Sequence, residues 1–302
     1  AEVRAIAGQK WKAEYLGSAD NVATIDYRYI PGPSAELTVK IYTPHGAGPF
    51  PAVIFFHGGG WVAGNIELNG VQHQQLAHDS RSVVIAVNYQ KAPEHAFPTP
   101  FDDCYATLEW VWQNSEALNI DREKIGIAGE SAGGNIAAGV ALKSRDVNGP
   151  KIAFQVLIYP ATDHNFDYTS MIDNAKGYAL STEGMKWYWK QYLSNPGDLE
   201  NPYCRPMAAK DFSNLPNTYL ITAELDPPVT AICVTVKVSL SASVSSATNN
   251  SDPELSVIVA SSLTASVSSA AAGASLTAVT LTVIVLADAL SASPSFTVKL
   301  KV

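Results

Sequence analysis

The chain has 302 residues, of which 47% are hydrophobic and 16% are charged, and its formal net charge is −8. This length suits one large α/β domain with a substantial core, and the acidic balance argues against nucleic acid as a partner, because phosphate binding requires a basic surface. No uninterrupted apolar run is long enough to predict a membrane span, and the three cysteines are too scattered for a disulfide framework or a zinc site.

Strands alternate with helices along the first three quarters of the chain. The expected strands are 37–43, 52–56, 83–89, 124–128, 154–159 and 218–225. The expected helices are 101–116, 131–145 and 183–193. This alternation predicts a mostly parallel sheet with helices on both faces. The stretch 163–215, rich in aromatics, Asn and Pro, interrupts the alternation and is interpreted as an insertion over the sheet.

The composition changes abruptly after Asp226. The 74 residues from Val229 to Val302 are almost entirely Ser, Ala, Val, Thr and Leu, and they include no His, Arg, Trp or Tyr. A Ser/Thr-rich stalk would contain more Pro, and a β-rich module would contain more turn residues. We favour a third hypothesis, that these letters do not record the protein's own side chains. Peptide sequencing that returned the same letters would contradict it.

The motif GESAG at 129–133 fits the pattern G-x-S-x-G between an apolar strand and a stretch that suits a helix. This context predicts a nucleophile elbow, a tight turn that lifts the Ser131 hydroxyl above the sheet edge. Small residues at Gly129 and Gly133 let the strand and helix backbones approach closely. A chance match is the alternative, since this pattern occurs in roughly one chain in ten of this size. The strand–turn–helix setting favours the elbow.

A second motif, HGGGW, follows the strand AVIFF directly. Its consecutive glycines allow backbone N–H groups to approach a ligand without obstruction. We interpret the loop, which includes His57 and Gly58, as an oxyanion hole formed by the N–H groups of Gly59, Gly60 and Ala132. A flexible turn or a phosphate loop is the alternative, but the chain has neither G-x-x-x-x-G-K-[ST] nor G-x-G-x-x-G after its first strand.

A carboxylate, Asp226, follows the apolar strand TYLITAEL. An Asp-Pro pair after a strand is usually a turn. Here Asp226 also follows Ser131 in the chain. In α/β-hydrolases the acid that orients the catalytic histidine lies between the serine and that histidine in the sequence.

Taken together, these motifs resemble those of hormone-sensitive-lipase-like esterases of the α/β-hydrolase superfamily over residues 23–228. The segments that carry the resemblance are HGGGW, NYQKAPEHAFP (88–98), GESAGGN (129–135), LIYP (157–160) and LITAELDP (220–227). The resemblance implies an α/β-hydrolase fold with a mostly parallel central sheet, helices on both faces and a helical cap from about 1–22 and 163–215. Residues 1–302 then form a single domain, of which 229–302 are the C-terminal part.

For the site, the resemblance implies Ser131 as nucleophile, Asp226 as triad acid, the same three oxyanion donors and no cofactor. The chain departs from the family at the triad histidine, which is expected about 30 residues after the acid, where Ser256 stands. All six histidines precede Asp226. Without a base, a serine hydroxyl is a poor nucleophile at neutral pH.

Aromatic residues near these motifs are candidates for the substrate pocket. Trp61 follows the glycine loop, and Trp187 and Tyr188 belong to the cluster WYWKQYL in the insertion. Plain packing of the cap against the core is the alternative for the cluster. Glu130 precedes the nucleophile in a tight turn and is interpreted as structural.

The sequence therefore predicts a serine carboxylesterase that hydrolyses short to medium acyl esters, with a small ester as its partner and no metal. A non-catalytic receptor for a small ligand, lacking the triad histidine, and an amidase or deacetylase remain alternatives. A homodimer is left open. The chain begins with Ala1 and not with Met, so a removed leader and the compartment stay open, with a soluble cytoplasmic protein slightly favoured.

Overall fold

The computed structural model describes residues 21–222, Asp226, 280–283 and 298–301. The chain divides into two compact units, Ala1–Cys233 and Val234–Val302. In the second unit, β8 (Thr280–Val283) pairs antiparallel with β9 (Val298–Lys301). The prediction that 229–302 complete a single domain lies largely outside the described residues and stays a prediction.

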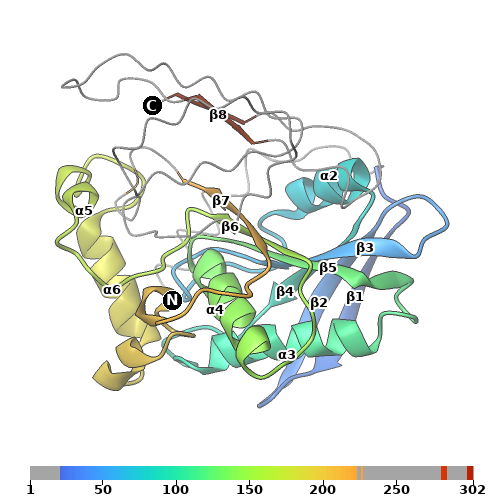
Figure 1. The fold of residues 1–302 in the computed structure, drawn as a ribbon, viewed down its shortest axis with the longest axis horizontal. Helices are drawn as coiled ribbons and strands as arrows, with labels where there is room; N and C mark the ends of the chain where they lie inside the picture. The colour runs from blue at the N-terminus through green and yellow to red at the C-terminus, as the bar shows by residue number, and fades with distance from the viewer. Residues whose placement is uncertain (1–20, 223–225, 227–279, 284–297, 302) are drawn as a thin grey trace. The chain divides into compact units, whose positions relative to one another are not determined.

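The first unit is built on a seven-stranded sheet with the order β1-β2-β4-β3-β5-β6-β7 (Figure 1). Its strands are β1 (Thr24–Pro31), β2 (Glu36–Thr43), β3 (Phe50–Phe56), β4 (Val83–Asn88), β5 (Ile120–Glu130), β6 (Phe154–Ile158) and β7 (Asn217–Ile221). Strand β2 runs antiparallel to β1 and β4, and all pairs from β4 to β7 are parallel.

Helices connect these strands and form the insertion. They are α2 (Gly70–Ser80), α3 (Thr99–Gln113), α4 (Ala132–Asp146), α5 (Thr169–Asp173) and α6 (Thr182–Tyr192), with the 3₁₀ turns η1 (Pro196–Glu200) and η2 (Pro206–Ala208). In the insertion, α6 buries Met185, Trp189 and Tyr192 in the same hydrophobic cluster as the sheet.

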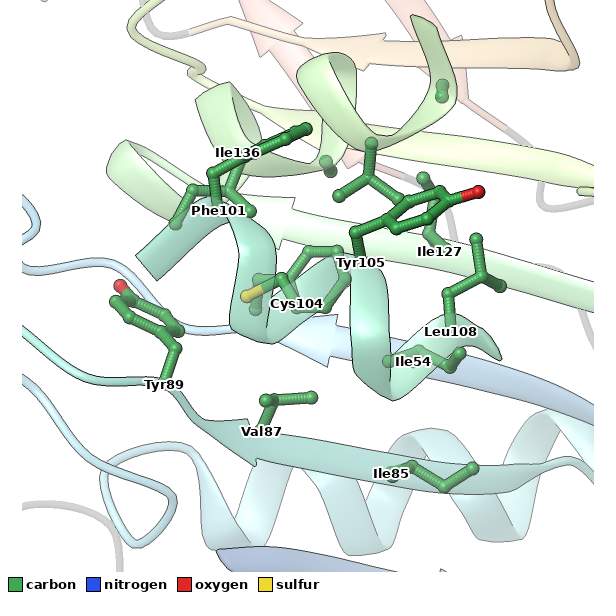
Figure 2. Close-up of a cluster of buried hydrophobic side chains, with 14 of the residues drawn as sticks. Ile54, Ile85, Val87, Tyr89, Phe101, Cys104, Tyr105, Leu108, Ile127 and Ile136 are labelled. Atoms are coloured by element: carbon green, nitrogen blue, oxygen red, sulfur yellow. The ribbon is translucent and has the colours of Figure 1, made fainter. Parts of the chain in front are cut away.

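The central strands are apolar on both faces because helices cover both. Along β3, the side chains of Ile54 and Phe56 join one cluster, and those of Val53 and Phe55 join another. This alternation follows from the two-residue period of a strand. Figure 2 shows the first cluster, in which α3 and α4 contribute side chains such as Phe101 that pack against the strands. Helix α2 contacts β4 and β2 on the opposite face.

The register of the parallel strands brings four connections to one edge of the sheet. Phe56 lies opposite Gly129, Glu130 lies opposite Ile158, and Ile158 lies opposite Ile221. The segments that follow these strands therefore meet at the carboxyl edge, where ligands bind in open α/β sheets.

The fold class and the mostly parallel sheet predicted from the sequence are confirmed, and six predicted strands and three predicted helices appear close to their expected bounds. Helix α4 begins at Ala132 and not at residue 131, because Ser131 adopts a non-helical conformation. The sequence analysis missed β1 and α2 altogether. Residues 223–225 of the last predicted strand and residues 1–20 of the predicted cap lie outside the described residues.

Candidate active site

Ser131 occupies a sharp turn between β5 and α4. Its backbone has φ 51° and ψ −118°, a conformation that residues other than glycine rarely adopt. Three hydrogen bonds hold it there. Its N–H donates to the Ile158 carbonyl at 2.8 Å, and its own carbonyl accepts from the N–H groups of Asn135 at 3.0 Å and Ala161 at 3.3 Å. Strain of this kind persists only where surrounding contacts fix the backbone, and it is concentrated at functional sites.

The two glycines of GESAG are required by close backbone contacts. A Cβ atom at Gly129 would lie 2.2 Å from the Gly133 carbonyl oxygen. A Cβ atom at Gly133 would lie 2.0 Å from the Phe56 carbonyl oxygen and 2.6 Å from that of His57. Any larger residue would force the backbones apart. The same contacts place the start of α4 directly against the loop that follows β3.

That loop is the HGGGW segment, and its glycines adopt conformations that side chains disfavour. Gly59 has φ 122° and Gly60 has φ 59°. A Cβ atom would lie 2.3 Å from the Ala63 carbonyl oxygen at Gly59 and 2.1 Å from the Tyr188 ring at Gly60. The loop therefore exposes backbone where side chains have no room.

In this loop, one backbone N–H group has a hydrogen-bond acceptor, and the next two do not. The Gly58 N–H donates to Glu130 Oε1 at 3.3 Å. The N–H groups of Gly59, Gly60 and Ala132 donate to no acceptor within the described part of the chain. Because unpaired backbone donors are costly when buried, three donors left available at one sheet edge suit a bound anion.

Several contacts from neighbouring segments hold the HGGGW loop in place. The Tyr89 hydroxyl donates to the His57 carbonyl at 2.7 Å, and the two rings stack with their centroids 4.3 Å apart. The Ala92 N–H donates to the Trp61 carbonyl at 3.0 Å. Trp61 Nε1 in turn donates to Asn135 Oδ1 at 3.3 Å. The segment NYQKAPEHAFP and helix α4 thus both hold this loop.

His57 is held as a neutral, structural side chain. Burial, aided by the charge of Lys91, lowers the pKa of His57 to about 3. Its Nδ1 lies 2.7 Å from the Gly58 carbonyl, which can only accept, so Nδ1 carries the proton. A group with this pKa and this hydrogen bond is unsuited to act as general base near neutral pH.

Asp226 lies beyond the end of β7, and burial raises its pKa to about 6. The charge of Asp226 acts on Tyr159, whose own pKa is raised by burial, by Glu130 and by Asp226. Within the described residues, no histidine is hydrogen-bonded to Ser131 or to Asp226. Ser256, where the triad histidine is expected, lies outside the described residues.

The three aromatic pocket candidates occupy different environments. Trp61 is 1% exposed and stacks on Tyr192 at 4.4 Å, so its side chain is part of the core. Trp187 is 40% exposed on α6. Tyr188 is half-buried and packs directly on Gly60.

Sequence reasoning did not identify Asn135, whose side chain joins three segments. Its Nδ2 donates to the Ala161 carbonyl at 2.8 Å and to the Cys204 carbonyl at 2.9 Å, while its Oδ1 accepts from Trp61. The signal was its place in GESAGGN, four residues after Ser131, where one helical turn returns to the elbow.

Among the described residues, no helix is long and apolar enough to cross a membrane. The same residues hold no group of three or more His, Cys, Asp or Glu side chains that could bind a metal ion.

Comparison with known proteins relates this chain to esterases. The sequence model of a family described as having the alpha/beta hydrolase fold, that of hormone-sensitive-lipase-like esterases, matches residues 53–252. The chain is 38% identical over 193 residues to an arylesterase of Saccharolobus solfataricus, covering 64% of this chain and 63% of that protein. It is 35% identical over 198 residues to carboxylesterase NlhH of Mycobacterium tuberculosis, covering 64% and 61%.

Solved structures give the same association. An esterase of Pyrobaculum calidifontis superposes with a TM-score of 0.67 at 37% identity, covering 70% of this chain and 69% of that one. EstE1, a thermostable carboxylesterase from a metagenomic library, superposes with a TM-score of 0.70 at 33% identity, covering 76% and 78%. The matched region covers less than two thirds of the length of the arylesterase and of NlhH.

Proposed function

The chain belongs to the α/β-hydrolase family of hormone-sensitive-lipase-like esterases, and from that premise we propose that it hydrolyses short to medium carboxylic esters through an acyl-enzyme on Ser131. The observation that carries the proposal is the strained elbow beside the glycine loop. It combines a serine at φ 51° with three adjacent N–H groups that have no acceptor among the described residues. A nucleophile and oxyanion donors are the two parts that acyl transfer requires.

In the proposed reaction, Ser131 Oγ attacks the ester carbonyl carbon, and a base takes the hydroxyl proton as the new C–O bond forms. The carbonyl oxygen becomes an oxyanion, which the N–H groups of Gly59, Gly60 and Ala132 stabilise. The base returns the proton to the departing alkoxide as its bond to carbon breaks. Water then attacks the acyl-enzyme in the same manner and releases the acid, restoring the Ser131 hydroxyl.

We propose a histidine from the C-terminal region as the base, with Asp226 stabilising its protonated form. Two facts support this assignment. The half-buried Asp226 carboxyl has a pKa of about 6, as expected for an acid that lacks a cationic partner. His57, the histidine of the HGGGW loop, is held neutral with a pKa of about 3. Tandem mass spectrometry of the natural protein should find a histidine about 30 residues after Asp226 in place of Ser256.

Two measurements test the esterase assignment. In the natural protein, with its own C-terminal region, a fluorophosphonate should modify Ser131, and the protein should release p-nitrophenol from p-nitrophenyl butyrate. Ser131→Ala should lose both properties, while Ser34→Ala, at an exposed serine, should keep them. Modification of another residue, or turnover that survives Ser131→Ala, would contradict the assignment.

One observation favours a second candidate function. The sequence has no histidine after Asp226, so a chain as written has a serine without its usual base. Such a protein would be a receptor that keeps the ligand pocket without catalysis. Absence of turnover together with saturable binding of a small carboxylate or ester would support this alternative. A panel of amides would separate an amidase or deacetylase from an esterase.

The proposed partner is a small ester. Assembly as a homodimer and a cytoplasmic location remain predictions from the sequence, and light scattering on the purified chain tests the first.

A further inference from the structure

We propose that Glu130 is a positioning residue that sets the geometry of the oxyanion hole, by binding the Gly58 N–H so that the next two N–H groups of the loop face the reacting carbonyl. This inference deepens the proposed esterase function and rests on it. It replaces the sequence-based interpretation of Glu130 as structural only.

The carboxylate of Glu130 accepts hydrogen bonds from three segments that are distant in the sequence. Oε1 accepts from the Gly58 N–H at 3.3 Å and from Asn69 Nδ2 at 2.7 Å. Oε2 accepts from the Tyr159 hydroxyl at 3.0 Å. One side chain thus joins the glycine loop after β3, the start of α2 and the connection after β6. A carboxylate offers about four acceptor positions, so these three donors can bind together.

Packing around Gly58 supports the same arrangement. A Cβ atom at Gly58 would lie 3.2 Å from Glu130 Cγ and 3.2 Å from the Glu130 carbonyl oxygen. The Gly58 backbone therefore rests on the Glu130 side chain, and the contact depends on the absence of a side chain at position 58. Glu130 immediately precedes the nucleophile, so its contact with Gly58 sets the distance between the glycine loop and the elbow.

The consequence concerns the direction of the loop's N–H groups. Glu130 satisfies the Gly58 N–H, while those of Gly59 and Gly60 have no acceptor within the described part of the chain. If Gly58 were released, the loop could rotate and the two free donors would move relative to Ser131. Oxyanion donors act at the transition state and must lie within a few tenths of an ångström of their best position.

Tyr159 extends this arrangement toward the acid. It is the first residue after β6 and has a positive φ of 35°. Its N–H donates to the Ile221 carbonyl at 2.6 Å. Both Glu130 and Asp226 raise the pKa of its hydroxyl, in addition to burial. The protonated hydroxyl therefore donates to Glu130 and also responds to the charge of Asp226.

The experiment compares Glu130→Ala, Glu130→Gln and Glu123→Ala in the full chain. Glu123 is a matched control because it lies on the same strand, β5, and pairs with exposed Lys151 at 2.9 Å. For Glu130→Ala we expect kcat on p-nitrophenyl butyrate to fall about 100-fold with KM within about twofold. Glu130→Gln keeps an acceptor for Gly58 and should recover kcat to within about fivefold of the wild type. Glu123→Ala should match the wild type.

A second readout does not depend on turnover. Hydrogen exchange at the Gly58 amide, followed by mass spectrometry on a peptide that spans the HGGGW loop, should accelerate about tenfold in Glu130→Ala and remain slow in Glu130→Gln. If Glu130→Ala fails to fold, the same measurement on Tyr159→Phe decides, with a smaller acceleration expected.

The outcomes separate the two proposals. An active wild type with unchanged kcat in Glu130→Ala, a rise in KM alone, or unchanged exchange at Gly58 would overturn the positioning role and leave the esterase function intact. An inactive wild type would overturn the esterase function, and the exchange data would still decide whether Glu130 holds the loop.

Discussion

The serine side and the acid side of the candidate site differ in how firmly their groups are held. Ser131 is fixed by three backbone hydrogen bonds, and the adjacent glycine loop is bound by Tyr89 and Glu130. On the acid side, Asp226 is a half-buried carboxyl whose pKa of about 6 results from partial burial alone. The geometry of the serine side is set by contacts within the described residues. On the acid side, Asp226 has no hydrogen-bonded partner among those residues.

This difference shows which part of the proposed acyl-transfer site the folded sheet supplies by itself. The elbow and the oxyanion donors are backbone features at the ends of β3 and β5, so the register of two paired strands is enough to bring them together. In the proposed mechanism, the acid and the base are side chains on separate segments after β7. Their pairing depends on the C-terminal region, where the composition changes.

The largest effect should come from the acid side. Asp226→Asn should lower kcat on p-nitrophenyl butyrate by about 10³- to 10⁴-fold, because the amide no longer orients and stabilises a protonated histidine. Steady-state kinetics at pH 7 measure the effect, with Asp211→Asn at an exposed turn as the control. A loss below about threefold would mean that Asp226 has no catalytic partner and that the two sides do not act together.

On the serine side, Gly60→Ala should reduce kcat about 100-fold, because its methyl group would collide with the Tyr188 ring and displace an oxyanion donor. Gly177→Ala is the matched control. That glycine also has a positive φ, 94°, but nothing lies within 4 Å of its Cβ position. In a Tyr188→Ala background the loss from Gly60→Ala should shrink. Equal losses at both glycines would indicate backbone strain alone.

A smaller effect tests whether the core holds the loop. Trp61→Phe removes the hydrogen bond to Asn135 and leaves space beside Tyr192, so the free energy of unfolding should fall by about 2 kcal/mol. Trp187→Phe, at an exposed tryptophan, should change it by less than about 0.5 kcal/mol. Urea unfolding followed by circular dichroism measures both. If the exposed substitution cost as much, burial would not explain the contribution of Trp61.

The smallest effect concerns pH. The pKa of Asp226 is raised from 3.8 to about 6 in the folded chain, so the folded state binds more protons than the unfolded state between these values. In the chain with Ser256, which has no histidine after Asp226, stability should therefore fall relative to Asp226→Asn as the pH rises from about 4 to 7. We expect about 1 kcal/mol, because partial exposure to water reduces the effect of the full shift. A gain in stability over the same range would show that a cationic partner already faces Asp226.

Much of the fold was predictable because its signals are local. The apolar run AVIFF becomes β3, and GESAG places a serine between a strand and a helix, as the structure shows. Strand β1 was missed because most of its side chains are exposed at the sheet edge, and α2 was missed because its sequence, GVQHQQLAHDS, has few apolar residues to form a stripe.

The parts of the site that could not be predicted depend on contacts between distant residues. Glu130 meets Gly58 across 72 positions and Asn69 across 61. Trp61 was expected to border the substrate, but its stacking on Tyr192 of the insertion buries it. No pattern in the sequence near these residues reports such partners, since they arise only when the strands are paired and the insertion is folded.

The most direct test of the central claim is an acid quench of the full chain during turnover of p-nitrophenyl butyrate, followed by tandem mass spectrometry of the peptide that contains GESAG. An acyl-enzyme mechanism predicts a butyryl ester on Ser131 that forms with the first release of p-nitrophenol and disappears when the substrate is exhausted. Turnover with the butyryl group on another residue, or with no acylated peptide under conditions that trap a control serine esterase, would contradict it.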